Sequence, residues 1–310
     1  LANGKTWRPG NYSNRSHGDN VPAYYGLEHS LNIASSRLSL AAGIPNIIDT
    51  LGKLGYEGNA PAVPSLALGS VSMSPLEVAQ IYNTIATGGY YTPLRAIKDV
   101  TTREGEPLNR YPLKLTQTVD AGPAYITTWM MERVARHGTG AGMYSTIDRS
   151  KTIAGKTGTT NNLRDAWFAG FGGNRLGVVW VGRDDNKPAK LTGATGALPI
   201  WSHIMADINT RGIVDTPPDS ITQVPLQLIF DPNAANQGAG NNPNQWFANG
   251  QSCSNAVKVP FIKGFVPQGL LNCDTDIMRV NAQQNQPANN RGRAPRDQDN
   301  DQGSWFERIF

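Results

Sequence analysis

Apolar side chains near the start of the chain follow the spacing of helices. The positions concerned are Tyr25, Leu27, Leu31, Ile33, Leu38 and Leu40. They recur mostly two to five residues apart on both sides of Ser30 and Asn32, as on one face of a helix. Because these two polar residues interrupt the apolar run, the pattern predicts two short helices that meet near them.

Three longer helices are predicted further along the chain. The first begins after Ser74, an N-cap residue with a glutamate three positions later, and it ends at Gly88. The second follows Asp120, which is a candidate N-cap, and ends at Gly138. The third covers residues 198–208. Each helix carries apolar residues on one side, so each is expected to pack against a core.

Short β-type runs lie between the second and third of these helices. They cover residues 152–159, 166–171 and 176–181. Asn and Gly residues at 161–162 and 172–174 separate the runs, which predicts the turns of an antiparallel meander. Helices followed by strands and then a helix indicate an α/β fold of the α+β kind, with an antiparallel sheet flanked by helices.

The chain divides by composition into three regions. Residues 1–210 carry nearly all of the regular patterning and should form the folded unit. Residues 211–280 are rich in Pro, Asn and Gln and predict a small loop-rich appendage. Residues 281–303 contain no Val, Ile, Leu, Met or aromatic residue. Ten of these 23 residues are Asn or Gln, so disorder is predicted there. The aromatic tip at 305–310 is either a docking element on this tail or an end of no consequence.

Composition excludes several classes of protein. The 310 residues are 39% hydrophobic, which suffices for an ordinary core. No uncharged apolar stretch reaches the length of a membrane-spanning helix. The net charge is only +4, and the one dense basic segment, at 291–296, is followed at once by three aspartates. Nucleic-acid binding is therefore not expected.

The two cysteines, Cys253 and Cys273, are compatible with one disulfide bond or with two free thiols. They are too far apart for a Cys-x-x-Cys redox pair, and no histidine cluster lies beside them to complete a zinc site. An even pair in a loop-rich stretch favours a disulfide if the compartment is oxidising. We expect neither a metal nor a cofactor.

The segment from Ala154 to Thr160 places lysine, threonine and glycine inside a predicted strand. In a phosphate-binding P-loop, Gly-Lys-Thr follows another glycine five residues earlier. That position here is Ser150, so the tight turn of a P-loop is missing. An ammonium and a hydroxyl on a strand can instead bind a carboxylate, and the small Gly158 leaves room for a substrate along the strand edge. The segment therefore favours a carboxylate site.

Two motifs agree with the active site of penicilloyl serine transferases. Lys156-Thr157-Gly158 is the only Lys-Thr-Gly in the chain, and Ser30-Leu31-Asn32, the only Ser-x-Asn, precedes it between two predicted helices. Further matches cover residues 74–79, 136–140, 154–162, 165–170, 180–184 and 193–196. The chain thus resembles the transpeptidase domain of class A penicillin-binding proteins, and its C-terminal part resembles the Gram-negative 1b type.

One element of that family is not found. No serine in the chain has a lysine three residues later, so the nucleophile of the Ser-x-x-Lys motif is missing. The resemblance implies that this motif lies before Ser-x-Asn, upstream of Leu1. The chain also begins without methionine, and Asn3-Gly4 already predicts a hairpin turn. We expect the 310 residues to lack the N-terminal part of the transpeptidase domain, the glycosyltransferase domain and the membrane anchor.

The resemblance implies roles for six residues. Ser30 would relay a proton to the leaving D-alanine amine, and Asn32 would hydrogen-bond the substrate amide. Lys156 would supply positive potential, while the hydroxyls of Thr157 and Thr159 would bind the substrate carboxylate. The Thr159 N–H would form half of an oxyanion hole. The expected catalytic residues are Ser30, Asn32 and Lys156, and the expected substrate-binding residues are Thr157, Gly158 and Thr159.

The resemblance implies a D,D-transpeptidase that cross-links peptidoglycan stem peptides through a serine acyl-enzyme. The expected partners are stem peptides, lipid II-derived glycan strands, β-lactams and regulators of cell-wall synthesis. The expected location is the periplasmic side of a Gram-negative inner membrane. Two alternatives stay open: a β-lactamase or D,D-carboxypeptidase of the same superfamily, and a non-catalytic binding module that keeps the site without its nucleophile.

Overall fold

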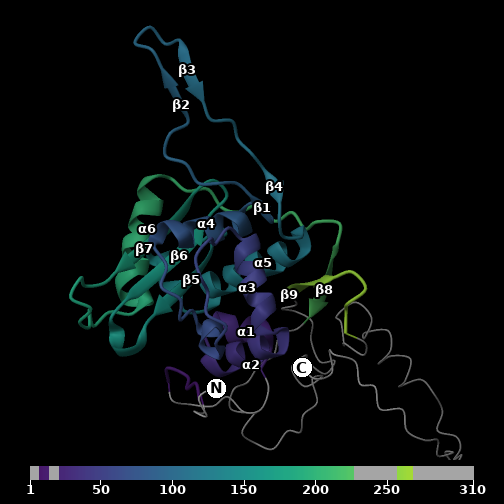
Figure 1. The fold of residues 1–310 in the computed structure, drawn as a ribbon. Helices are drawn as coiled ribbons and strands as arrows, with labels where there is room; N and C mark the ends of the chain where they lie inside the picture. Colours follow the sequence, from purple (N-terminus) through teal and green to yellow (C-terminus); the bar gives the residue numbers. More distant parts are fainter. Residues whose placement is uncertain (1–6, 14–20, 227–256, 268–310) are drawn as a thin grey trace, which may run out of the picture. The chain divides into compact units, whose positions relative to one another are not determined.

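The computed structural model describes residues 7–13, 21–226 and 257–267. The chain forms two compact units. The first contains Leu1–Asn14 and Ala23–Ser220, and the second contains Arg15–Pro22 and Ile221–Phe310. Helices surround a small sheet in the first unit (Figure 1). Every one of the six candidate site residues belongs to this first unit.

Two short helices meet at Ser30, as the apolar spacing predicts. They are α1 (Ala23–Glu28) and α2 (Asn32–Ala42). A third helix, α3 (Ile44–Lys53), follows α2 directly and was not predicted from the spacing. Gly43 separates α2 from α3 with a φ of 88°, a left-handed conformation that favours glycine. A 3-10 turn, η1 (Pro64–Leu68), comes next.

The three longer helices form where predicted: α4 (Pro75–Ala86), α5 (Ala121–His137) and α6 (Leu198–Asp207). The start of α4 is a complete capping box. Ser74 Oγ accepts the Glu77 N–H at 3.3 Å, and the Glu77 carboxylate accepts the Ser74 N–H at 2.7 Å. Asp120 occupies the N-cap position of α5, but its side chain forms no capping hydrogen bond, so the predicted capping role is wrong.

The predicted antiparallel meander is present in the strand order β5-β6-β7. Its strands are β5 (Ala154–Thr159), β6 (Ala166–Phe171) and β7 (Leu176–Val181). The register pairs Lys156 with Ala169 and Gly158 with Trp167. Strand β5 begins two residues later than the pattern predicts. Within the described residues β5 is an edge strand, so no second strand pairs with its other side.

Two clusters of buried side chains hold the helices against this sheet. In the larger cluster, the rings of Phe168 on β6 and Trp201 on α6 meet edge to face, with centroids 4.9 Å apart. Trp201 also donates its indole N–H to the Gly177 carbonyl at 3.0 Å, which ties α6 to β7. In the smaller cluster, Met131 on α5 packs with Ala154 and Phe171. The cores thereby fix α5 next to β5.

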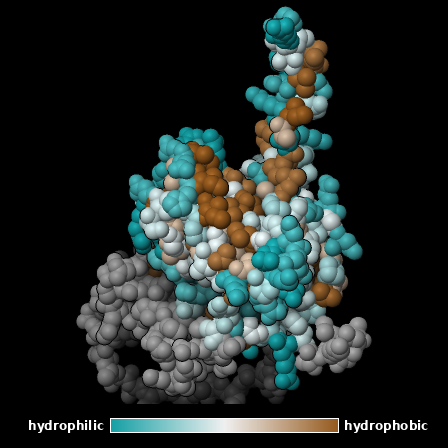
Figure 2. All heavy atoms as spheres, turned by 90° about the vertical axis from the view of Figure 1, so that its left-hand side faces the viewer, coloured by the Kyte–Doolittle hydropathy of each residue, from teal (hydrophilic) through white to brown (hydrophobic). Residues whose placement is uncertain are grey.

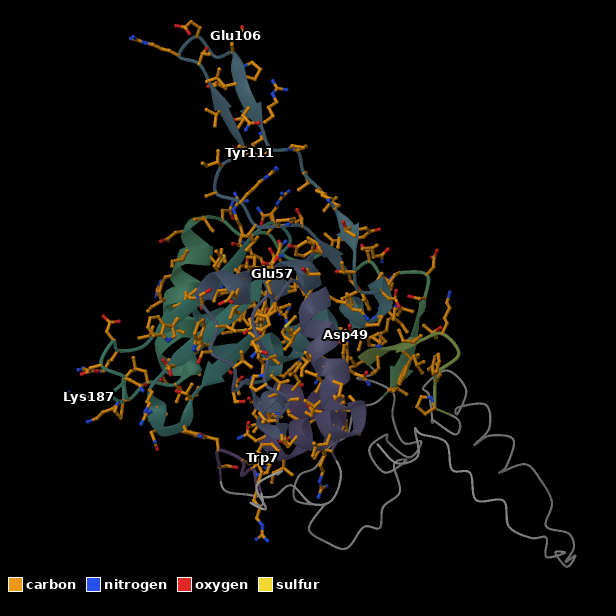
Figure 3. The ribbon with its side chains drawn as sticks, viewed as in Figure 1. Trp7, Asp49, Glu57, Glu106, Tyr111 and Lys187 are labelled. Atoms are coloured by element: carbon orange, nitrogen blue, oxygen red, sulfur yellow. The ribbon has the colours of Figure 1, made fainter. Side chains whose placement is uncertain are left out.

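An arm of paired strands between α4 and α5 was not predicted. It contains β1 (Tyr90–Tyr91) paired with β4 (Thr116–Gln117) and β2 (Asp99–Thr101) paired with β3 (Pro107–Arg110). The β2–β3 hairpin projects from the body of the first unit, with Glu106 near its tip and Tyr111 near its base (Figures 1 and 3). Apolar side chains line the arm in Figure 2. The exposed ones include Ile97, Val100, Leu108, Leu113 and Leu115.

The described part of the second unit is a two-stranded antiparallel sheet. It pairs β8 (Ile221–Leu226) with β9 (Val257–Ile262). Other predictions lie outside the described residues: the Asn3-Gly4 hairpin, the Cys253–Cys273 disulfide and the tail from 281 onward. The division at 210 and 280 therefore stays a prediction. Across the described ranges, no helix is long and apolar enough to cross a bilayer.

Candidate active site

Lys156 lies on β5 and reaches the connection between α1 and α2. Its Nζ donates hydrogen bonds to Ser30 Oγ and to the Thr157 carbonyl, each at 2.8 Å. Ser30 and Lys156 are 126 positions apart in the sequence. The fold therefore joins the two predicted motifs through one charge-assisted hydrogen bond.

The backbone at Ser30 is held in a left-handed conformation, with a φ of 54°. The Ser30 N–H donates to the Leu27 carbonyl at 3.1 Å, and the Leu31 N–H donates to the Gly26 carbonyl at 2.8 Å. A serine in this conformation costs about 1 kcal/mol or more, so the surrounding structure must impose it. The resulting turn presents the Ser30 hydroxyl to Lys156.

A buried ion pair anchors α1 on α5. Arg133 Nε donates to Glu28 Oε2 at 2.8 Å, and the Glu28 side chain is only 6% exposed. The guanidinium also lies over the Tyr24 ring, 4.9 Å from its centroid. Burial acts to raise the pKa of Glu28, but the hydrogen bond with His29 and the charge of Arg133 outweigh it and hold this pKa below its ordinary value. The ion pair thus positions the segment that carries Ser30.

A second link joins the end of α5 to both motifs. Gly138 ends α5 against the Glu28 carbonyl, and a Cβ at this glycine would overlap that oxygen. The next N–H, from Thr139, donates to the same carbonyl at 3.2 Å. The Thr139 hydroxyl lies 2.7 Å from the Thr157 hydroxyl. Thr139 therefore contacts α1 through its backbone and β5 through its side chain.

Lys156 carries a positive charge that the neighbouring protein does not neutralise. Among the described residues, no carboxylate lies within ion-pair distance of its Nζ. Burial lowers the pKa of Lys156 to about 8. An unpaired ammonium in a partly buried place attracts a ligand carboxylate more strongly than an exposed one does. The described part of the chain has no cluster of three or more acidic, His or Cys side chains that could hold a metal.

The end of β5 is fixed by a single π turn, η4 (Gly193–Ala197). The Gly193 N–H donates to Thr159 Oγ1 at 3.0 Å. A Cβ on Gly193 would overlap the Trp167 carbonyl and would lie 2.6 Å from the Gly158 carbonyl, so this close approach requires glycine. The exposed Thr159 hydroxyl accepts here and keeps its own hydrogen for a ligand.

Asn32 is the first residue of α2, and its amide nitrogen points to a different neighbour. Asn32 Nδ2 donates to the Gly10 carbonyl at 2.8 Å, and the Ile33 N–H donates to Asn11 Oδ1 at 3.1 Å. These bonds hold the segment 7–13 against the start of α2. The side-chain Oδ1 of Asn32 can therefore serve as a hydrogen-bond acceptor, while its Nδ2 is engaged by Gly10.

Comparison with known proteins decides the family. A family model described as the penicillin-binding protein transpeptidase domain matches residues 2–205. The chain belongs to this transpeptidase family. The predicted penicilloyl serine transferase fold is therefore confirmed, and so is the resemblance to penicillin-binding proteins.

Curated relatives of this transpeptidase chain match the same region. Penicillin-binding protein 1B of Vibrio cholerae is 41% identical over 203 residues, which cover 65% of this chain and 26% of the relative. Penicillin-binding protein 1B of Escherichia coli is 37% identical over 224 residues, which cover 72% of this chain and 26% of the relative. The chain spans about a quarter of the length of these relatives.

Solved structures share the transpeptidase fold. The crystal structure of penicillin-binding protein 1A from Haemophilus influenzae has a TM-score of 0.70 at 25% identity and covers 85% of this chain and 43% of that chain. PonA1 from Mycobacterium tuberculosis in complex with penicillin V has a TM-score of 0.58 at 22% identity and covers 67% of this chain and 61% of that chain. The second likeness shows the fold alone.

Three residues that organise this transpeptidase site were not predicted from the sequence: Glu28, Arg133 and Thr139. Glu28 is the last residue of α1 and lies between the apolar residues Leu27 and Leu31. An acidic residue in such a place indicates a buried ion pair but does not identify its partner. Thr139 lies in the segment 136–140 that resembles the family. Only the folded chain shows that its hydroxyl meets Thr157.

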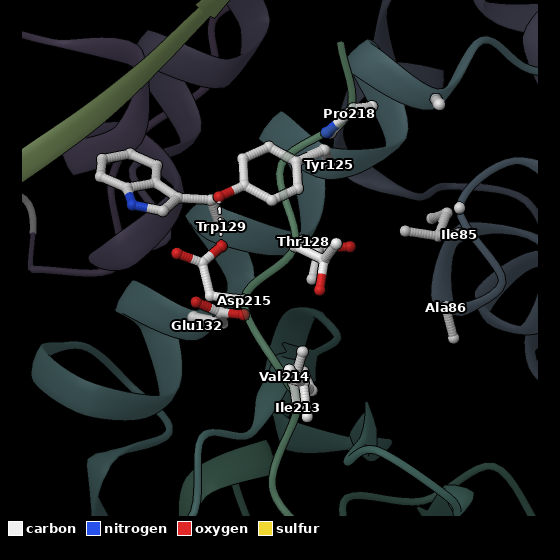
Figure 4. A pocket seen from close by; sticks show the side chains of 13 residues that line it. Ile85, Ala86, Tyr125, Thr128, Trp129, Glu132, Ile213, Val214, Asp215 and Pro218 are labelled. Carbon is white, nitrogen blue, oxygen red and sulfur yellow. Dashed lines mark hydrogen bonds between the residues drawn. The ribbon is translucent and has the colours of Figure 1, made fainter. Parts of the chain in front are cut away.

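A separate pocket of about 190 Å³ lies between the end of α4, α5 and residues 213–218 (Figure 4). Glu132 and Asp215 both line it, and the Tyr125 hydroxyl donates to Asp215 Oδ1. Burial, and after it the charge of Asp215, raise the pKa of Glu132 to about 7 although Arg136 opposes the shift. None of the six candidate site residues lines this pocket, so it is distinct from the Ser30–Lys156 site.

Proposed function

We propose that this chain supplies the Ser-x-Asn and Lys-Thr-Gly part of a D,D-transpeptidase site that cross-links peptidoglycan stem peptides. The hydrogen bond of 2.8 Å from Lys156 Nζ to Ser30 Oγ carries the proposal, because it joins an ammonium and a hydroxyl as a proton relay requires. Membership of the transpeptidase family supports the reaction class. The likeness to penicillin-binding proteins 1B supports a bifunctional peptidoglycan synthase as the source.

The proposed substrate contacts lie along β5. The terminal carboxylate of the stem peptide binds the Lys156 ammonium and the Thr157 hydroxyl, and the exposed Thr159 hydroxyl is a further donor. Gly158 lets the peptide lie along the open edge of the strand. The side-chain Oδ1 of Asn32 accepts a hydrogen bond from the N–H of the substrate amide.

The proposed reaction has two acyl-transfer steps. A serine hydroxyl attacks the carbonyl between the two D-alanine residues, the amide C–N bond breaks and an acyl-enzyme ester forms. The proton of the attacking hydroxyl passes through Ser30 to the leaving D-alanine amine. An acceptor amine then attacks the ester, forms the new amide bond and gives up a proton to the serine oxygen, which leaves as the free serine. Lys156 donates to Ser30 Oγ, so the Ser30 hydrogen remains available to the leaving amine. The Thr159 N–H stabilises the oxyanion, and losing one such donor costs about 3 kcal/mol.

The nucleophile of this reaction is not found in the 310 residues, because none of their serines has a lysine three positions later. We propose that it belongs to a Ser-x-x-Lys segment outside them, in a protein that also carries a glycosyltransferase domain and a membrane anchor. The relatives from Gram-negative bacteria support a place on the periplasmic side of the inner membrane. Glycan strands made from lipid II, β-lactams and regulators of cell-wall synthesis are the proposed partners.

A fluorescent penicillin tests the proposal. Protein expressed from the complete gene should form a covalent adduct, and K156A should slow this acylation about a hundredfold or more. K151A is the matched control, because Lys151 lies five residues earlier and donates to Asn209 instead, at 3.2 Å. The 310-residue chain alone should stay unlabelled.

Four results contradict parts of the proposal. If K156A is acylated at the rate of the wild type, Lys156 has no role in the acylation. A labelled 310-residue chain places the nucleophile among its own serines. No labelling of the complete, folded protein favours a non-catalytic binding module. Product analysis with a pentapeptide substrate should show a cross-linked dimer, whereas hydrolysed product alone favours a β-lactamase or D,D-carboxypeptidase.

A further inference from the structure

Thr139 follows the end of a third element, α5, and hydrogen-bonds both to the segment of Ser30 and to the Lys-Thr-Gly strand. Its N–H donates to the Glu28 carbonyl at 3.2 Å, two residues before Ser30. Its hydroxyl lies 2.7 Å from the Thr157 hydroxyl. Gly138 and Gly140 flank Thr139, and Gly138 is packed too closely against Glu28 to carry a side chain. The position of Thr139 is therefore fixed from its backbone.

Two paired hydroxyls leave one choice open, which is the direction of the hydrogen bond. Either Thr139 or Thr157 can be the donor across the 2.7 Å contact. A hydroxyl has a single hydrogen but can accept as well. If Thr157 gives its hydrogen to a ligand carboxylate, its oxygen can still accept from Thr139. Thr139 must then be the donor of this pair.

We propose that Thr139 is a positioning residue that orders the Thr157 hydroxyl for binding the carboxylate of the substrate. The inference rests on the proposed function of Thr157. In the bound state, Thr139 O–H donates to Thr157 Oγ1, and Thr157 O–H donates to the carboxylate. Such a chain of hydrogen bonds strengthens its last member, because each donor polarises the next. Thr139 does not itself touch the substrate.

The first experiment measures recognition of the carboxylate by the 310-residue chain. NMR titrations with N-acetyl-D-Ala-D-Ala and with its C-terminal amide give two dissociation constants, and their ratio isolates the carboxylate. In T139V this ratio should fall about tenfold, which corresponds to one hydrogen bond of ordinary strength. Binding of the amide should change little. T139S should keep the ratio, because it keeps the hydroxyl.

T127V is the matched control variant. Thr127 lies on α5 and donates its hydroxyl to the Pro123 carbonyl at 2.8 Å within the helix. T127V removes a threonine hydroxyl from α5 that does not reach Thr157. It therefore shows whether destabilising α5 is enough to change the ratio of the two dissociation constants. T127V should leave the ratio of the two dissociation constants unchanged.

The second experiment needs no ligand. The unfolding constants of T139V, T157V and the double variant are measured in urea. Each substitution multiplies the unfolding constant by a factor. If the hydroxyls interact, the factor for the double variant should be about tenfold smaller than the product of the two single factors. Simple multiplication of the two effects would show that the hydroxyls do not interact and would overturn the inference whatever the peptides do.

The outcomes of the titrations separate this inference from the proposed function. If the wild-type chain prefers the carboxylate peptide and T139V keeps that preference, the inference is wrong while the proposed function stands. If the wild-type chain shows no preference, the carboxylate role of Thr157 is wrong, and the role given to Thr139 is wrong with it. If T139S lowers the ratio as much as T139V does, the effect comes from packing of the Thr139 methyl group and not from its hydroxyl, and the inference is wrong.

Discussion

Lys156 is the residue whose charge state controls the proposed carboxylate site. Burial lowers its pKa to about 8, so the ammonium is charged below that pH and largely neutral above it. The preference for the carboxylate peptide over its amide should therefore fall about tenfold or more between pH 7 and pH 9.5. NMR titrations of the 310-residue chain at several pH values measure this change.

The control for this pH profile is a lysine outside the site. K156Q should show a low preference at every pH, because it has no charge to lose. K151Q should keep the wild-type profile, since Lys151 donates to Asn209 and not to Ser30. A wild-type preference that stays constant up to pH 9.5 would mean that Lys156 does not bind the carboxylate.

Single residues of the site differ in how far the sequence reveals them. Ser30 and Lys156 belong to short motifs, so residue type and order sufficed to find them. The left-handed backbone of Ser30 and the contact of Thr139 with Thr157 were not predicted. Both depend on how α1, α5 and β5 pack, and a serine or threonine carries no mark of its hydrogen-bond partner.

At the scale of elements, the Glu28–Arg133 pair should hold α1 on α5. R133L removes the arginine partner of the buried Glu28 carboxylate, and breaking such a buried pair typically costs about 3 kcal/mol. Glu28 has a lowered pKa, so this contribution is present above its ordinary value of 4.5 and is lost as the pH falls through the folded-state pKa. Urea denaturation of wild type and R133L at pH 7 should show the loss.

The double variant E28Q/R133L tests whether the lost charge partner causes this effect. It removes the stranded carboxylate, so it should be more stable than R133L alone at pH 7. The difference between the two variants should shrink at low pH, where Glu28 becomes protonated. Equal stability of wild type and R133L at pH 7 would show that packing alone positions α1.

Glu132 on α5 should change the pH dependence of stability in the direction opposite to that of Glu28. Its pKa is about 7 in the folded chain and ordinarily 4.5, so the folded state takes up a proton between these values. Stability from this group is therefore highest below pH 4.5 and falls as the pH rises towards 7. E132Q should match wild type near pH 4.5 and be more stable at pH 8, by about 3 kcal/mol at most.

The measurement for Glu132 is urea denaturation at pH 4.5 and pH 8. E57Q is a suitable control, because Glu57 is exposed on the surface of the first unit (Figure 3). E57Q removes an exposed carboxylate and shows how much the replacement of a glutamate by glutamine changes the measurement by itself. If E132Q shifts stability equally at both pH values, the effect comes from the shape of glutamine and not from the charge near Asp215.

Elements were predictable where local signals and burial agree. The capping box of α4 and the strands β6 and β7 follow from residues close together in the sequence. The β2–β3 hairpin was missed because all of its strand residues are exposed, so no alternation of apolar and polar positions marks it. Helix α3 was missed although Ile44, Ile47, Ile48 and Leu51 recur at helical spacing, so the sequence did carry a signal for it.

At the scale of the whole molecule, the transpeptidase family model covers most of the chain. Residues 2–205 match the family, yet the chain spans about a quarter of the length of its curated relatives. The family resemblance that the motifs carry predicted the fold class of the first unit, but it did not predict α3 or the arm formed by β1 to β4. The strand pair β8–β9 was not predicted, because its partners are separated by a long polar stretch.

The cysteine pair allows a test of the proposed location of the whole protein. If Cys253 and Cys273 face an oxidising compartment, they should form one disulfide, which typically stabilises a loop of this length by about 3 kcal/mol. A thiol assay on denatured, unreduced protein from the periplasmic side should find no reactive thiol, and reduction should release two. C253S should leave Cys273 as a reactive thiol. The control variant S252A should keep both cysteines bonded and show no reactive thiol. Two reactive thiols before reduction would exclude the bond and would remove this support for the proposed location. The assignment of Ser30 and Lys156 to the candidate site does not depend on this bond, because it rests on their own hydrogen bond.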